Sequence, residues 1–135
     1  MIRRSTWEAD LNAYLREVRD RPFEWGVHDC AMFAAGAVLS MTGVDPIPEF
    51  RGEYDSAVGS ARALIRLGYA DLEAAMDAKF AETPIAMAQR GDLVWHDMSV
   101  GVCMGGHGLF VGEEDSGEGL IRIPRSDWMK AWRVG

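Results

Sequence analysis

The chain has 135 residues, a length that suits one domain. Hydrophobic residues make up 48% and charged residues 26% of it, which is ordinary globular composition and excludes a disordered or collagen-like chain. The formal net charge of −7 at pH 7 repels phosphate backbones, so we expect no nucleic-acid partner. No apolar run reaches the ~20 residues of a membrane-spanning helix, so we expect no membrane insertion.

The cysteines, the histidines and the start of the chain each exclude a further class. Acidic residues at Glu8 and Asp10 follow the early arginines, so we expect no signal peptide. The two cysteines, Cys30 and Cys103, are too few for a disulfide scaffold, and we expect free thiols. Together with three histidines they show no metal-ligand spacing, so we expect neither a metal nor a cofactor.

Residues 5–20 predict an amphipathic helix. Ser5 and Glu8 have the spacing of a capping box, and Pro22 ends the helix because it pushes the preceding residue out of the α region. The apolar side chains fall on one helical stripe: Trp7, Leu11, Tyr14, Leu15 and Val18.

Residues 30–41 predict the central helix of the fold. The run carries no charge and is rich in alanine, which is typical of a helix buried on nearly every side. Asp29 is suited to cap its N-terminus and Gly43 to end it.

The rest of the chain predicts two further helices and then a sheet. We expect helices at 56–67 and 72–80, while the short apolar stretch 85–88 fits no single type. After Gly91 the period shortens toward two, and strands are expected at 92–96, 99–104, 108–111, 119–123 and 128–134. The order predicts one α+β domain, with helices over about 1–88 and an antiparallel meander over about 91–135.

Cys30 is the first candidate for chemistry. In the first turn of the predicted central helix, unpaired N–H groups and the helix dipole would lower the pKa of its thiol and favour a reactive thiolate. The alternative is that Cys30 is only a small buried hydrophobe.

Three motifs resemble the NlpC/P60 family of papain-like cysteine peptidases: Phe23-x-Trp25-Gly26-x-His28-Asp29-Cys30, Arg90-Gly91-Asp92-Leu93-Val94 and Val100-Gly101-Val102. Four motifs more closely resemble short proteins encoded among the tail genes of phages and gene-transfer agents: Trp25 to Cys30, Thr42 to Asp45, Arg51 to Tyr54, and Ala131 to Val134. The resemblance implies a papain-like domain whose buried central helix packs on the C-terminal sheet, with Cys30 as the nucleophile.

The resemblance also places two unsuitable residues at the remaining catalytic positions. Ser99 stands where the family has its histidine, and Val111 where it has a third, polar residue. His96 is a substitute base if Asp97-Met98 is a tight turn, because it then lies opposite Ser99 on a face directed at Cys30. His28 is a second candidate, for stabilising a thiolate, although it is equally suited to capping or packing.

Two functions at a tail tip stay open at this point, and a third, that of a free cytosolic redox or acyl-transfer protein, has only Cys30 to support it. One is a tail-tip peptidase that cleaves peptide bridges of peptidoglycan, with Cys30 as nucleophile, His96 as base and a backbone N–H at the helix start holding the oxyanion. The other is an inactive structural component of the tail tip that binds hub, baseplate or fibre proteins. Both imply a virion protein that is made in the bacterial cytoplasm.

Overall fold

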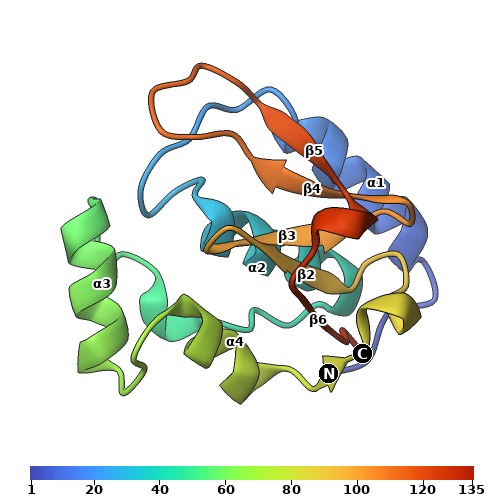
Figure 1. The fold of residues 1–135 in the computed structure, drawn as a ribbon, viewed down its shortest axis with the longest axis horizontal. Coiled ribbons are helices and arrows are strands. Elements are labelled where there is room, and N and C mark those ends of the chain that lie inside the picture. The colour runs from blue at the N-terminus through green and yellow to red at the C-terminus, as the bar shows by residue number, and fades with distance from the viewer.

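A computed structural model describes all residues, Met1–Gly135, as an α+β fold with its helices first (Figure 1). The four expected helices are confirmed, with bounds within a few residues of the expectation: α1 Trp7–Val18, α2 Cys30–Thr42, α3 Ala57–Arg66 and α4 Leu72–Lys79. Single turns of 3-10 helix lie at Pro48–Phe50, Ile85–Met87 and Arg125–Asp127. None of the helices has the length and apolar character required to traverse a bilayer.

The two ends of α2 match the expectation, whereas the capping box before α1 was wrong. The Asp29 carboxylate caps α2 by accepting from the Met32 N–H, and Gly43 ends the helix at φ 76°. Ser5 lies in a turn ahead of α1, the N-cap is Thr6, and no side chain caps that end. The Thr6 hydroxyl instead donates to the Asp10 carboxylate.

The sheet has six antiparallel strands in the order β1-β6-β2-β3-β4-β5. The strands are β1 Glu82–Thr83, β2 Leu93–His96, β3 Ser99–Cys103, β4 His107–Val111, β5 Leu120–Pro124 and β6 Lys130–Trp132. Strands β2 to β5 form the expected meander. The expectation of a simple meander was wrong at one edge, because β6 returns to lie between β2 and a short β1 that the periodicity did not reveal.

Both faces of the sheet are buried, and α2 covers one of them. Trp95, Val100 and Val102 belong to the main core with the apolar side chains of α1 and α2. The other face carries a smaller cluster: Ala88, Val94, Cys103, Phe110, Trp128 and Ala131. The alternation of β2 and β3 therefore divides neighbouring residues between two separate cores.

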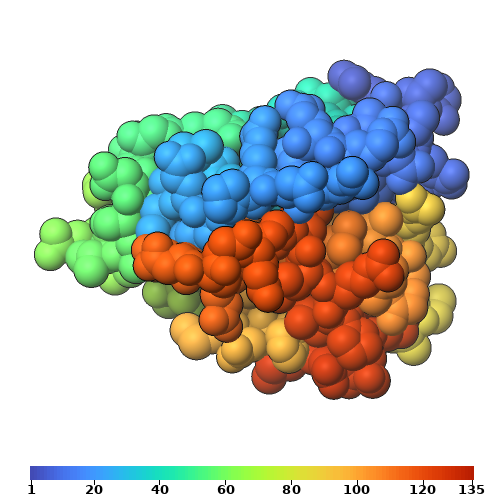
Figure 2. Space-filling model, turned by 90° about the horizontal axis from the view of Figure 1, so that it is seen from above, coloured from blue at the N-terminus to red at the C-terminus, as the bar shows by residue number.

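Long-range contacts fasten the start of the chain to the sheet. The blue N-terminal segment lies against the orange strands in Figure 2, and the backbone N–H of Leu120 donates to the carbonyl of Arg19. The chain ends meet, as Figure 1 shows. The Arg3 guanidinium donates to the Val134 carbonyl and to the buried Asp92 carboxylate at 2.8 Å.

Candidate functional site

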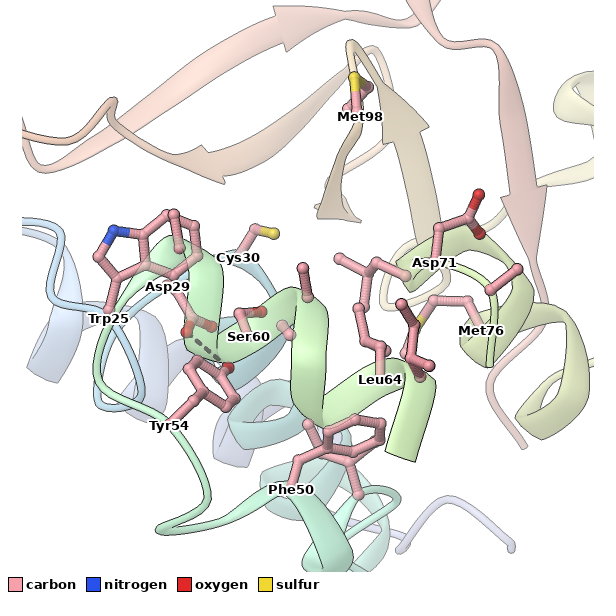
Figure 3. A pocket seen from close by; sticks show the side chains of 17 residues that line it. Trp25, Asp29, Cys30, Phe50, Tyr54, Ser60, Leu64, Asp71, Met76 and Met98 are labelled. Carbon is pink, nitrogen blue, oxygen red and sulfur yellow. Dashed lines mark hydrogen bonds between the residues drawn. The ribbon is translucent and has the colours of Figure 1, made fainter. Parts of the chain in front are cut away.

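The start of α2 is held by a buried carboxylate that accepts three hydrogen bonds. Asp29 is 2% exposed. Its Oδ1 accepts from the Met32 N–H at 2.9 Å. Its Oδ2 accepts from the Gly26 N–H at 2.9 Å and from the Tyr54 hydroxyl at 2.6 Å, the contact dashed in Figure 3. The carboxylate therefore fixes the loop before α2, the first turn of α2 and the segment before α3 together.

Cys30 follows this cap and faces a cavity (Figure 3). The residue is partly exposed and its thiol is free. Burial raises the pKa of this thiol, and the neighbouring Asp29 carboxylate raises it further. Hydrogen bonding by the Ser99 side chain and by the Val100 backbone lowers it without cancelling the effect of burial. A backbone hydrogen bond at Ala31, in the first turn of α2, lowers this pKa as expected, but desolvation of the sulfur outweighs it and the net shift is upward.

The cavity has a volume of about 260 Å³ and lies between α2, α3 and α4. Most of its seventeen lining residues are apolar, among them Phe50, Leu64, Leu72 and Met76. The turn between β2 and β3 contributes Met98 at its edge (Figure 3). Such a chamber favours an apolar group over a sugar or a carboxylate.

His96 lies opposite Ser99 in the β2–β3 hairpin, as expected, but its side chain packs on the face of the sheet that is turned away from α2. Its ring makes an edge contact with Phe110, and its Nδ1 lies 3.0 Å from the carbonyl oxygen of Asp127. Phe110 belongs to the smaller core, away from α2. The expected direction of His96 toward Cys30 was wrong, because the larger Trp95 and Val100 side chains fill the face that packs on α2.

The remaining sequence candidates also lie apart from the cavity. The ring of His28 is 3% exposed and makes an edge contact with Phe33, and its Nε2 has no hydrogen-bond partner. Burial lowers the pKa of His28, so the imidazole is neutral at pH 7. Val111 packs in the main core. The structure thus places Cys30 and Asp29 on the cavity lining, and places neither His28 nor His96 there.

Tyr54 is a site residue that the sequence did not predict. Its hydroxyl donates to Asp29, twenty-five positions earlier in the chain, and its ring lines the cavity. Burial and the Asp29 charge raise the pKa of Tyr54. The one signal in the sequence was its membership of the Arg51 to Tyr54 motif, which carries no information about its partner. No group of three or more histidine, cysteine or acidic side chains is arranged to hold a metal ion.

Comparison with solved structures gives the class of this fold. The chain superimposes on the crystal structure of the NlpC/P60 domain of the peptidoglycan hydrolase SagA with a TM-score of 0.58. The two chains are 17% identical, and the match covers 93% of this chain and 97% of the other. The fold is therefore NlpC/P60-like, which confirms the expected papain-like fold class.

The chain belongs to the DUF6950 family, a domain of unknown function, whose sequence model matches residues 2–134. No curated protein matches it.

Proposed function

We propose that this protein is a structural component of a phage-like tail tip, one that uses an NlpC/P60-like scaffold to bind neighbouring tail proteins and does not hydrolyse peptidoglycan. The tail location is supported by the order and spacing of the four short motifs described above. Its partners would be hub, baseplate or fibre proteins, and its location the virion, after synthesis in the bacterial cytoplasm.

The observation that carries the proposal is the surroundings of the Cys30 sulfur. A cysteine peptidase needs a thiolate, a base at ~3 Å from the sulfur or one water away, and a group that orients the base. Here burial raises the pKa of the thiol, and no histidine lines the cavity that Cys30 faces. The base proposed from the sequence, His96, contacts Phe110 on the opposite face of the sheet.

A peptidase is the second candidate, and the capped start of α2 favours it. Cys30 occupies the first helical position and lines an open-sided cavity, which is a suitable place for a nucleophile. For this reaction His96 would have to leave its contact with the Asp127 carbonyl and pass the edge of the sheet.

The two candidates differ in what Cys30→Ala changes. Purified wild-type protein and Cys30→Ala are incubated with isolated peptidoglycan, and released muropeptides are measured by mass spectrometry beside an active hydrolase. We expect no release from either protein, and equal copy numbers of the two in purified tail particles. Release by the wild type that Cys30→Ala abolishes would establish the peptidase instead. Absence of both proteins from particles would overturn the tail assignment.

Alkylation gives an independent measurement on the thiol. We expect iodoacetamide at pH 7 to modify Cys30 at least tenfold more slowly in the folded protein than in the same protein unfolded in urea, since the thiolate is the reacting species. A faster reaction in the folded state would contradict the raised pKa.

A further inference from the structure

The turn between β2 and β3 adopts a conformation that its residues disfavour. Asp97 and Met98 both lie in the left-handed region, at φ 47° and φ 62°. Two-residue hairpins of this shape are typically built from Asn-Gly, since asparagine tolerates positive φ and glycine has no Cβ to clash. Methionine at the second position stores strain, and such strain concentrates at sites with a function.

The strained turn holds an apolar side chain in water beside the cavity. Met98 is 83% exposed and lines the edge of the cavity (Figure 3). Ile65 of α3 lines the same cavity and is 67% exposed. Together they form an apolar edge, and methionine is a side chain that adapts to irregular binding partners. A ligand that covered this edge would recover the apolar surface now left in water.

The charges at the cavity have one sign. Asp29 and Asp71 are the charged lining residues, and no lysine or arginine lines the chamber. Asp29 is buried and already accepts three hydrogen bonds. Asp71 is exposed. Only its Oδ1 accepts a hydrogen bond, from the Ala74 N–H, and this bond caps α4. A second exposed carboxylate, Asp97, lies in the strained turn itself.

We propose that this cavity is the docking site for a basic segment of a partner protein, which inserts one large apolar side chain between two lysines or arginines. The volume of about 260 Å³ has room for one leucine, methionine or phenylalanine side chain, because a 150 Å³ cavity already holds benzene. The lysines or arginines on either side of that side chain would face the carboxylates of Asp71 and Asp97. A fatty acid is disfavoured as the ligand, because its own carboxylate would be repelled by these two negative charges. The inference rests on the proposed binding function and adds the chemistry of the partner.

The test uses three capped pentapeptides and the folded protein with ¹³C-labelled methionine methyl groups. The peptides are Gly-Lys-Leu-Lys-Gly, the same sequence with serine for leucine, and the same with glutamate for both lysines. We expect the first peptide to shift the Met98 and Met76 signals on titration. We expect the serine and glutamate peptides to bind at least tenfold more weakly, because each lacks one of the two contacts.

A double variant separates a binding role of the turn from a structural one. Asp97→Asn with Met98→Gly supplies the residues that the turn prefers, so we expect a higher urea midpoint and at least threefold weaker binding of the leucine peptide. Met129→Ala, which removes an exposed methionine that does not line the cavity, is the matched control and should change neither quantity.

Three results would overturn the docking proposal: equal binding of the three peptides, tighter binding of decanoate than of the leucine peptide, or a Met98 signal that moves with protein concentration alone. The last result would show that a second copy of the chain covers the edge. None of these measurements involves tail particles, so their failure is distinguishable from failure of the tail assignment.

Discussion

Replacing Asp29 by asparagine tests how much of the fold depends on the buried carboxylate. The side-chain oxygen of asparagine can still accept from the Met32 N–H, because asparagine is as good an N-cap as aspartate. Its amide nitrogen would then face the Gly26 N–H and the Tyr54 hydroxyl, two donors that now bind Oδ2. Hydrogen bonds to a charged group are each worth about 1.5–3 kcal/mol and two are lost, so we expect a loss of about 3–6 kcal/mol in the free energy of unfolding.

The assay is urea unfolding at pH 7 and 25 °C, followed by tryptophan fluorescence. Asp71→Asn is the matched control: Asp71 caps α4 with one bond on the surface, so asparagine should cost less than about 0.5 kcal/mol. Because burial and the Asp29 charge raise the pKa of Tyr54, Asp29→Asn should also bring that pKa down toward its ordinary value, measured by ultraviolet titration. Equal losses for the two variants would refute the special role of Asp29.

Three further substitutions test the packing and the pH dependence. Gly36→Ala should destabilise the protein by about 1–3 kcal/mol despite the better helix propensity of alanine, because the alanine methyl group would overlap the Tyr14 hydroxyl. Urea unfolding measures this loss, and a stabilised variant would contradict the close approach of α1 to α2. Arg125→Ala should cost about 3 kcal/mol in calorimetry, because the guanidinium donates to three backbone carbonyls, whereas exposed Arg122→Ala should cost under about 0.5 kcal/mol. Burial lowers the pKa of His28 below its ordinary value of 6.5. Below about pH 6.5 the unfolded state therefore binds more protons than the folded state, and the free energy of unfolding decreases as the pH is lowered. His28→Leu should therefore lose less stability than the wild type between pH 7 and pH 5, and identical losses would contradict this.

The sequence by itself determined the central helix and the hairpin. The run that begins at Cys30 has no charge. Its capping residues, Asp29 at the start and Gly43 at the end, act on backbone groups within four residues, so no distant contact was needed to place the helix. The pairing of His96 with Ser99 followed from the two-residue turn and the alternation of the flanking strands.

Only the tertiary structure decided which face of the hairpin meets α2. Leu93, Val94 and Trp95 are all apolar, and both faces of the sheet are buried, so the alternation fixed which residues share a face but not what covers it. The same holds for the place of β6, which pairs with strands distant from it in the chain.

The state of the Cys30 thiol was also beyond the sequence. Its local position favours a thiolate, yet desolvation of the sulfur and the charge of Asp29 outweigh the helix terminus. Desolvation depends on every atom that surrounds the sulfur, and some of those atoms come from β3, some seventy positions further along the chain. Local sequence determines the position of a residue on its helix or strand, whereas the chemistry of its side chain depends on the residues that the rest of the chain packs around it.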